Sequence, residues 1–447
     1  MHGVIPPIRH RIAIVGTGIS GMSAAWLLSQ RHDITVYEQA DRIGGHSNTV
    51  LLRGGTNAVA VDTGFIVYNE RTYPNLTALF AHLDVPTTPS DMSFSVSLDD
   101  GAFEYAGGCG LNGLIAQKRN IARPRYWSLL GDLVRFYRSA AQDLPELDAT
   151  TVSLRDYLHV RGYGSAFRDD HLLPMAAAIW SAPTETILDF PAASFIRFFD
   201  NHGLLEFRDR PQWRTVVGGS RVYAERLTAP YRDRIRLGAA VSEIVRECGQ
   251  VRVRDSSGHT ETFDHVVVAT HANQALRMLA DPSDEERDLL GAFRYSRNLA
   301  VLHADPVLMP KRRAAWAAWN HLGRGQQASV TYWMNRLQPL PDTTPLFVTL
   351  NPTVTPRDLF CSETYEHPIL DAAAAGAQRH LWSLQGRLNT WFCGAHFGAG
   401  FHEDALQAGL AVAEALGGGR RPWLVTGESS RIFVTPMRTP PAQRIAA

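Results

Sequence analysis

The stretch Arg11-Ile-Ala-Ile-Val-Gly-Thr-Gly-Ile-Ser-Gly21 begins as an apolar run and ends in three spaced glycines. Residues 22–28 then have helical composition, and Ile34-Thr-Val-Tyr-Glu38 has the composition of a second strand. Two strands joined through a helix of this size pair in parallel. The stretch therefore predicts the first strand-helix-strand unit of an α/β domain.

Each glycine of this loop has its own physical reason. Gly16 makes a tight turn, Gly18 lets the backbone approach a pyrophosphate, and Gly21 lets the helix pack close to the strand. The free N–H groups at the start of the helix favour an anion. Glu38 ends the next strand, where a carboxylate accepts hydrogen bonds from ribose hydroxyls. The spacing predicts a dinucleotide site.

A second patch follows directly in Asp41-Arg-Ile-Gly-Gly-His-Ser47. Arg42 can pair with phosphate oxygens, and the glycine doublet exposes further backbone donors. A plain NAD domain has no need of this patch, so it favours FAD. The alternative is a glycine turn beside a surface arginine.

Length and composition limit what the chain can be. A chain of 447 residues exceeds one hydrophobic core, so two domains are expected. The formal net charge is +0, which gives no reason to expect nucleic acid as a partner. The four cysteines are scattered without C-x-x-C spacing, so neither a metal site nor a disulfide framework is expected. We find no signal peptide and no stretch of the ~18 apolar residues that a membrane span needs, which predicts a cytoplasmic protein.

The predicted domains are discontinuous. Alternating strand patterns follow Ile235, His265-Val-Val-Val-Ala-Thr270 is a buried-strand pattern, and Thr390-Trp-Phe-Cys393 leads into a helix at 404–416. The intervening segments are richer in aromatic residues and proline. We therefore predict an FAD-binding domain from 8–90, 211–280 and 385–420, a substrate domain from 91–210 and 281–384, and a C-terminal tail at 421–447.

These motifs resemble the flavin amine oxidase and phytoene desaturase superfamily. Its signature combines the glycine loop, the acidic residue, Arg-x-Gly-Gly and a C-terminal segment, matched by Gly394-Ala-His-Phe-Gly-Ala-Gly-Phe-His-Glu-Asp404. The resemblance implies an α/β fold, with a Rossmann-like two-dinucleotide-binding-domain FAD part and an interleaved α+β substrate domain. It also implies that the N-terminus of the last helix points at the flavin pyrimidine edge, where its dipole stabilises the charge of reduced flavin.

The resemblance extends to particular positions. Together with the glycine loop and Glu38, it implies that FAD is held by Gly16, Gly18, Ile19, Ser20, Gly21, Glu38, Gln39, Arg42, Gly44, Gly45, His46, Thr63, Gly64, Phe65, Ile66, Val241, Thr270, Gly394, Phe401, His402 and Glu403.

A narrower resemblance is carried by Val61-Asp-Thr-Gly-Phe-Ile-Val-Tyr-Asn69, Trp316-Ala-Ala-Trp-Asn320 and Gly400-Phe-His-Glu-Asp404. These phrases are similar to a bacterial group of predicted NAD/FAD-binding proteins that accompany enzymes like cyclopropane fatty-acid synthase. The group implies a lipid or other apolar small-molecule substrate and a methyltransferase partner of the cyclopropane-synthase type. A related flavoprotein role is desaturation of methylated acyl chains on phospholipids.

His402 and Glu403 are the candidate catalytic residues. Either could relay a proton while a hydride leaves an activated C–H for flavin N5. The alternative is that Glu403 and Asp404 are first-turn carboxylates favoured by the helix dipole, and that His402 serves the flavin through its backbone N–H. Asp62 is expected to organise a loop rather than to catalyse.

Two departures count against amine oxidation. Amine oxidases of this superfamily place a lysine near flavin N5, on a strand expected at 295–303, and this chain has none there. They also hold the amine between two aromatic rings. Phe401 could supply one ring, but Ala395-His396 offers no second tyrosine.

Two basic and aromatic clusters suit contact with anionic lipid at the inner membrane face. An ordinary solvated face is the alternative for each. Their residues are Lys118, Arg119, Arg123, Arg125, Tyr126 and Trp127 in the first cluster, and Lys311, Arg312, Arg313, Trp316 and Trp319 in the second.

The favoured hypothesis is an FAD-dependent desaturase or dehydrogenase of fatty-acyl chains in membrane lipids, acting by hydride transfer to flavin N5. The alternatives are a redox-neutral flavin isomerase that moves a double bond, an amine oxidase, and a non-catalytic lipid- or partner-binding protein.

Overall fold

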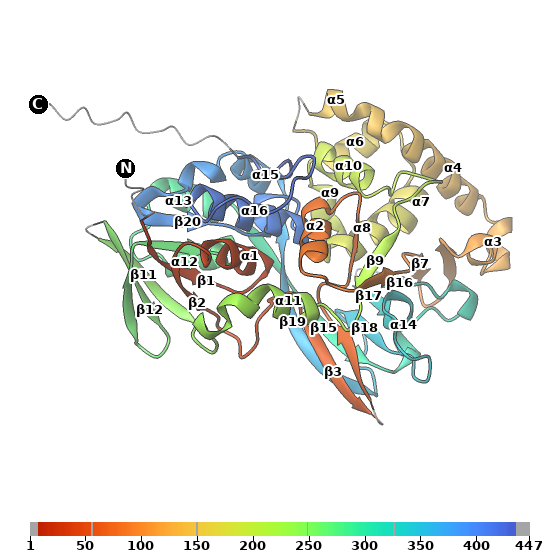
Figure 1. The fold of residues 1–447 in the computed structure, drawn as a ribbon. Coiled ribbons are helices and arrows are strands. Elements are labelled where there is room, and N and C mark those ends of the chain that lie inside the picture. Colours follow the sequence, from red (N-terminus) through yellow and green to blue (C-terminus); the bar gives the residue numbers. More distant parts are fainter. Residues whose placement is uncertain (1–7, 55–56, 149–150, 248, 325–326, 435–447) are drawn as a thin grey trace, which may run out of the picture.

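A five-stranded parallel sheet organises the part of the molecule that is predicted to bind FAD, which we call the FAD part (Figure 1). The computed structural model describes residues 8–54, 57–148, 151–247, 249–324 and 327–434. The strand order of this sheet is β10-β2-β1-β14-β20, and every neighbouring pair is parallel. Its strands are β1 (Arg11–Val15), β2 (Asp33–Tyr37), β10 (Ile235–Arg236), β14 (His265–Val268) and β20 (Thr390–Phe392). The predicted parallel pairing of the first two strands is confirmed.

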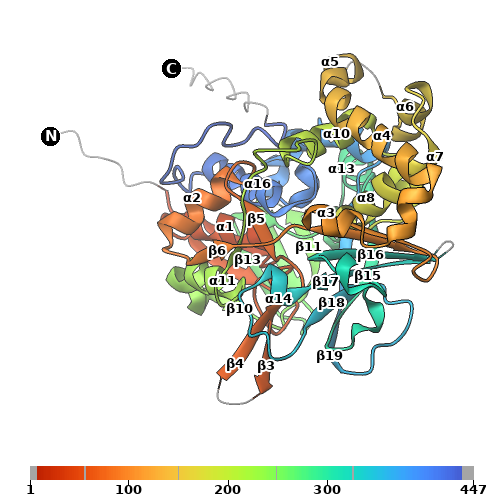
Figure 2. The same ribbon diagram turned by 90° about the vertical axis from the view of Figure 1, so that its right-hand side faces the viewer.

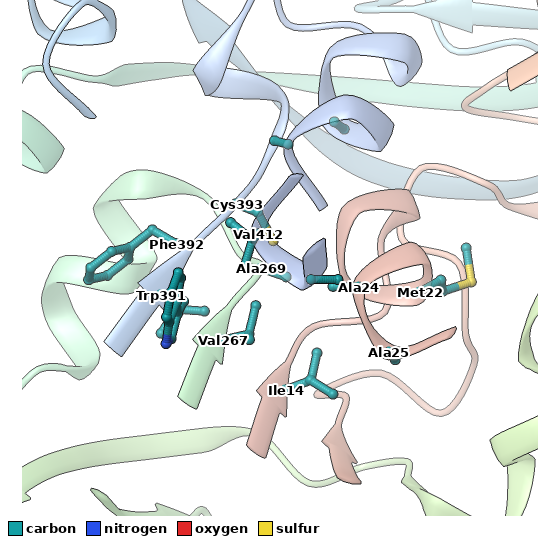
Figure 3. Close-up of a cluster of buried hydrophobic side chains, with 14 of the residues drawn as sticks. Ile14, Met22, Ala24, Ala25, Val267, Ala269, Trp391, Phe392, Cys393 and Val412 are labelled. Atoms are coloured by element: carbon teal, nitrogen blue, oxygen red, sulfur yellow. The ribbon is translucent and has the colours of Figure 1, made fainter. Parts of the chain in front are cut away.

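Two helices that are distant in the sequence pack together on this sheet. They are α1 (Ile19–Leu28) and α16 (His402–Ala415), the second beginning two residues before its predicted start at 404. A Cβ at Gly409 would lie 2.2 Å from the Ser20 carbonyl oxygen, so no larger residue fits there. Figure 3 shows Ala24 on the side of α1 that faces Val412 of α16, whereas Met22 lies on the other side of α1. Since each helix follows the carboxyl end of a strand, both N-termini lie at the same edge of the sheet.

The FAD part also carries smaller elements. These are the antiparallel strands β11 (Val241–Glu247), β12 (Gln250–Asp255) and β13 (Thr260–Phe263), and the helices α11 (Arg221–Thr228), α12 (Ala272–Met278), α13 (Asp284–Gly291) and α15 (Ala372–Gln378). Helices α13 and α15 lie within the 281–384 segment predicted for the substrate domain, but their buried residues share the core of the parallel sheet.

The substrate part is a seven-stranded sheet with helices on one side (Figure 2). Its strand order is β19-β15-β18-β17-β16-β7-β8. The strands are β7 (Phe94–Leu98), β8 (Phe103–Gly107), β15 (Arg294–His303), β16 (Trp319–Arg324), β17 (Gln327–Trp333), β18 (Phe347–Leu350) and β19 (Leu359–Ile369). The helices are α3 (Gly110–Leu114), α4 (Pro124–Ser139), α5 (Leu144–Leu147), α6 (Leu154–Val160), α7 (Ser165–Phe167), α8 (Leu173–Trp180), α9 (Thr184–Leu188), α10 (Ala192–Asn201) and α14 (Met334–Leu337). None of the helices in the described ranges is both long and apolar enough to cross a membrane.

The two parts are joined by short elements around Asp62. The elements are β3 (Thr49–Gly54), β4 (Asn57–Asp62), β5 (Val67–Asn69), α2 (Pro74–His82), β6 (Thr87–Pro89) and β9 (Trp213–Val216). The buried Asp62 carboxylate accepts hydrogen bonds from Ser220 N at 2.9 and 3.0 Å and from Thr49 Oγ1 at 2.6 Å. It therefore ties the strand before the 63–66 loop to the start of α11, which is the organising role expected for it.

The segment after α16 packs against the FAD part. The buried Arg421 donates from Nε to Glu414 Oε1 at 2.8 Å and from Nη1 to Asn75 Oδ1 at 2.8 Å. Trp423 stacks on Trp26, and Ile432 joins the core. Up to residue 434 the segment predicted as a tail is thus anchored to the FAD part at Arg421, Trp423 and Ile432. Its remainder, 435–447, lies outside the described residues.

Candidate functional site

One continuous cavity of ≈ 1340 Å³ lies between the two parts and is lined by both. Small-molecule pockets usually span about 300–1,000 Å³. The cavity is therefore large enough for a dinucleotide cofactor together with a second ligand.

The first glycine loop forms one end of this cavity. Gly16 has φ +101°, and a Cβ there would lie 2.9 Å from the Ala269 carbonyl oxygen. A Cβ at Gly21 would lie 2.0 Å from the Gly16 carbonyl oxygen, so α1 can approach the turn only without a side chain. A Cβ at Gly18 would meet no protein atom within 4 Å. It would project into the space where the pyrophosphate of a dinucleotide approaches the loop.

The start of α1 is open to an anion. Its first residues, Ile19 and Ser20, line the cavity. Gly18 supplies no side-chain cap, and the first turn holds no acidic residue. The uncapped N–H groups and the helix dipole therefore favour a phosphate at this position.

Glu38 is fixed beside this phosphate position. Its carboxylate accepts hydrogen bonds from Thr17 N at 2.9 Å and from Ala40 N at 2.9 Å. Both Glu38 and Gln39 line the cavity. The carboxylate is thus held by backbone donors at the place where a ribose would follow the phosphates.

The second glycine patch lies directly on the first. A Cβ at Gly45 would lie 3.2 Å from Gly18 Cα, and Arg42 Nη1 donates to the Gly45 carbonyl oxygen at 2.8 Å. Arg42, Gly45 and His46 line the cavity. Gly44 does not line it, because its φ of +110° serves the turn, where a Cβ would lie 2.4 Å from the Ser47 carbonyl oxygen. Two donor patches converge here, which fits the pyrophosphate of a dinucleotide such as FAD.

The loop at 63–66 lines the next part of the cavity through Thr63, Gly64, Phe65 and Ile66. Phe65 N donates to the His46 carbonyl oxygen at 2.7 Å. A Cβ at Gly64 would lie 2.2 Å from the same oxygen, so glycine is required at this contact. Of the remaining predicted positions, Val241, Thr270 and Gly394 also line the cavity.

The N-terminus of α16 reaches the cavity through Phe401 and His402. The His402 ring stacks on Phe65 at 3.8 Å, and its Nε2 lies 2.8 Å from Tyr223 Oη and 3.1 Å from Ser47 Oγ. Burial, with a smaller effect of His46, lowers the pKa of His402 to about 3. His402 is therefore a neutral wall residue whose Nε2 is already engaged by hydroxyl groups.

Glu403 does not line the cavity, so its predicted catalytic and cofactor-binding roles are corrected. The side chain is fully buried and points to α2. Its oxygens accept hydrogen bonds from Asn75 N at 3.1 Å, from Leu76 N at 3.0 Å and from Gln407 Nε2 at 3.0 Å. Burial raises the pKa of this carboxyl. Glu403 satisfies the free N–H groups of the first turn of α2. Gly21, also predicted to bind the cofactor, lies behind the cavity wall and serves packing alone.

The sequence motifs missed a group of histidines in the cavity wall. His271 stacks on Tyr295 at 4.4 Å, and its Nδ1 lies 3.4 Å from Glu366 Oε2. His367 Nδ1 accepts a hydrogen bond from Asn298 Nδ2 at 3.0 Å. These residues come from β15, β19 and the turn after β14, and no spacing in the sequence connects them.

Acid is expected to destabilise the protein through its buried histidines. Burial lowers the pKa of His271 to about 4 and those of His46, His367 and His396 to about 3, from 6.5. A depressed histidine pKa contributes stability above 6.5 that is lost as pH falls toward the folded-state value, by up to about 1.4 kcal/mol per pH unit and histidine.

Thermal melting measured from neutral pH downward, with and without excess FAD, should therefore show a falling midpoint below pH 6.5. Asp62 acts in the opposite direction, because burial raises the pKa of its carboxyl to about 6. A melting midpoint that stays constant or rises on acidification would show that the histidines do not dominate the pH dependence of stability.

Away from the glycine loops the cavity continues as an apolar arm. Its walls carry Leu130, Leu133, Val134, Met175, Ile179 and Leu204. The first three lie on one face of α4, since residues three and four apart are neighbours on a helix. Polar groups are few along this arm: Tyr105 Oη lies 2.8 Å from His171 Nδ1, and Arg210 lines the cavity beside Tyr137. The arm suits a long apolar ligand.

The groups expected of an amine site are not found in the cavity. No lysine belongs to its described lining, and β15 contributes Tyr295 and Arg297. The Phe401 ring stacks on Phe198 with centroids 4.6 Å apart, which leaves no gap for an amine between these two rings.

Comparison with known proteins identifies relatives of this arrangement. The model of the family "flavin containing amine oxidoreductase" matches residues 19–336. The AofH protein of Mycobacterium tuberculosis, named as a flavin-containing monoamine oxidase, is 28% identical over 291 residues, which cover 62% of this chain and 60% of that protein. The chain thus spans less than two thirds of the length of this relative.

Two solved structures share the fold over nearly the whole chain. Cyclohexylamine oxidase from Brevibacterium oxydans has a TM-score of 0.66 at 17% identity and covers 92% of this chain and 100% of its own. A fatty acid isomerase from P. acnes that produces CLA has a TM-score of 0.65 at 15% identity and covers 93% and 99%. At these identities the likeness shows the fold alone.

Proposed function

Because the chain belongs to the family of flavin-containing amine oxidoreductases and is an FAD-dependent oxidoreductase, we propose that it dehydrogenates the fatty-acyl chains of membrane lipids. The observation that carries this proposal is the apolar arm that continues from the cofactor end of the cavity between α4 and α8. A substrate with a long hydrocarbon chain fills such an arm at a gain of about 0.8 kcal/mol per buried CH₂.

One group of cavity residues would bind the cofactor, and another would exclude water from it. The two glycine patches and Glu38 hold the ADP half of the cofactor, and the 63–66 loop with Phe401 and His402 forms the wall beyond it. Bound FAD would supply the hydride acceptor. Because burial lowers the pKa of the wall histidines to about 3 or 4, they would relay the proton that leaves the neighbouring carbon to water rather than retain it. A saturated acyl carbon is not acidic, so the reaction depends on positioning more than on a strong base.

Anaerobic spectroscopy with extracted bacterial phospholipids tests this function. We expect the flavin of the purified protein to lose its yellow absorbance, and mass spectrometry to find acyl chains lighter by two hydrogens. Bleaching by amines but not by lipids would sink the proposal in favour of amine oxidation. A rearranged acyl chain without bleaching would show the redox-neutral isomerase instead.

The apolar arm can be tested by placing a charge in it. Val134→Arg puts a guanidinium in the arm, where an unpaired charge costs several kcal/mol. We expect flavin content to stay unchanged and reduction by lipids to be lost. The matched control is Gly131→Arg on the same helix, since Gly131 is exposed and a Cβ there meets no atom within 4 Å. Equal rates of flavin reduction in both variants would show that the substrate does not bind in the apolar arm.

The predicted partner is a methyltransferase of the cyclopropane-synthase type. In this proposal it supplies the methylated acyl chain that the flavoprotein then oxidises. It remains a proposal from the resemblance of the sequence.

A further inference from the structure

Two segments nearly 200 residues apart in the sequence form one face of the substrate part. Helix α3 packs against the 3₁₀ turn Arg313–Ala315, and Cys109 Sγ lies 4.0 Å from the Trp316 carbonyl oxygen. This contact brings together the two basic and aromatic clusters seen in the sequence. We call residues 111–127 together with Arg313 the docking face; Figure 1 shows its helix α3 at the outer edge of the substrate part.

The docking face exposes large apolar side chains. The exposed fractions are 76% for Leu111, 38% for Ile115, 46% for Ile121 and 56% for Trp127. Trp127 Nε1 donates to the Ile121 carbonyl oxygen at 2.8 Å, so these two residues are neighbours. Single exposed apolar residues are ordinary, whereas a group of them with a tryptophan is typical of an interaction surface.

The same face carries positive charge that is only partly neutralised: Arg125 pairs with Asp170, with its Nε 2.7 Å from Asp170 Oδ2, whereas other basic residues of the face have no such partner. Arg119 and Arg123 both donate to the Ala102 carbonyl oxygen, at 2.7 and 3.0 Å, which leaves their charges uncompensated. Among the residues that the structure describes, neither these arginines nor Lys118 forms an ion pair with a carboxylate. Across the contact, the guanidinium of Arg313 lies 3.7 Å from the centroid of the Trp316 ring rather than beside a carboxylate. Apolar side chains among unpaired cations match an anionic lipid surface.

The docking face adjoins the apolar arm. Leu114, which lies between the exposed Leu111 and Ile115, lines the cavity, and so does Leu130 of α4. Residues three and four apart are neighbours on a helix, so Leu111 and Ile115 of the docking face lie directly beside the cavity wall at Leu114. A lipid chain could pass from a bilayer held on this face into the arm with little exposure to water.

We propose that the docking face binds the surface of an anionic phospholipid bilayer and delivers acyl chains to the cavity. The delivery rests on the proposed function, whereas the binding does not. The expected orientation places α3 and the start of α4 at the membrane, with the FAD part turned away from it (Figure 1).

Co-sedimentation of the flavin-loaded protein with vesicles tests the docking without turnover. We expect binding to vesicles of phosphatidylglycerol and phosphatidylcholine in equal parts, weak binding to phosphatidylcholine alone, and release at high salt. Lys118→Gln with Arg119→Gln should lower the partition coefficient roughly 30-fold at low salt. Leu111→Ser with Trp127→Ser should lower binding at all salt concentrations.

Matched controls change exposed residues elsewhere. Arg287→Gln with Arg379→Gln removes two exposed arginines of the FAD part, and Val160→Ser with Leu424→Ser removes side chains that are 79% and 91% exposed. Both control proteins should bind like the unchanged protein. Equal loss in controls and docking variants, or binding that does not need anionic lipid, would overturn the proposal.

Failure of the docking can be told apart from failure of the function. Oxidation of detergent-dispersed lipid without any vesicle binding would refute the docking face and leave the function standing. Vesicle binding without oxidation of any lipid would support the docking face and refute the function.

Discussion

Gly18→Val should yield a folded protein that contains no flavin. The backbone of Gly18 has φ −60° and ψ 170°, which a residue with a side chain adopts without strain, and a Cβ there meets no protein atom within 4 Å. The added methyl groups would instead occupy the space through which a pyrophosphate approaches the loop. We expect the Kd for FAD to rise at least about 100-fold, which corresponds to about 2.8 kcal/mol.

Flavin absorbance per protein and titration of the apoprotein with FAD measure this effect. The apoprotein of the Gly18→Val variant should melt at the same temperature as the apoprotein of the unchanged chain, because no protein contact is lost. The matched control is Gly376→Val in α15, where a Cβ likewise meets no atom within 4 Å. A Gly18→Val protein with full flavin content would show that the cofactor lies elsewhere in the cavity.

Glu403→Ala should destabilise the protein strongly without affecting the chemistry of the flavin that remains bound. Truncation leaves the N–H groups of Asn75 and Leu76 and the amide of Gln407 without their acceptor in a fully buried site. Each unsatisfied donor costs about 1–3 kcal/mol, so a loss of about 3 kcal/mol or more is expected. Urea unfolding measures it.

Glu403→Gln separates a structural role from a catalytic one. Its amide oxygen can still accept from the first turn of α2, so we expect a smaller loss of stability and an unchanged rate of flavin reduction. Glu225→Ala serves as the control, because Glu225 is exposed on α11. If the Glu403→Gln protein were stable but its flavin were no longer reduced, Glu403 would have a catalytic role after all. The buried position of Glu403 argues against that result.

The ADP half of the site could be predicted from the sequence because its reasons are local. Gly16, Gly18 and Gly21 serve a turn, a ligand and a helix contact within one strand-helix unit, and Glu38 ends the next strand. The same holds for Arg42 and the glycine doublet, which follow directly. Local spacing constrains the backbone of such a unit before any distant contact forms.

The far end of the cavity depends on orientation within a helix. His402 and Glu403 are neighbours in the sequence, but a helix turns by about 100° per residue. One side chain therefore faces the cavity and the other faces α2. The sequence could not distinguish them, since which face of α16 meets the cavity follows from the packing of α1 and α2 against it.

The fold class, the preference for FAD over NAD and the residues around the first phosphates follow from local sequence patterns. Which distant groups line the same cavity is seen only in the folded chain, where His271 and His367 come from different segments. The tertiary structure also joined residues 111–127 to Arg313 in a single face. The physical reason is that the backbone conformation of a turn is set by its own residues, whereas side chains meet across a cavity only after distant strands and helices have packed.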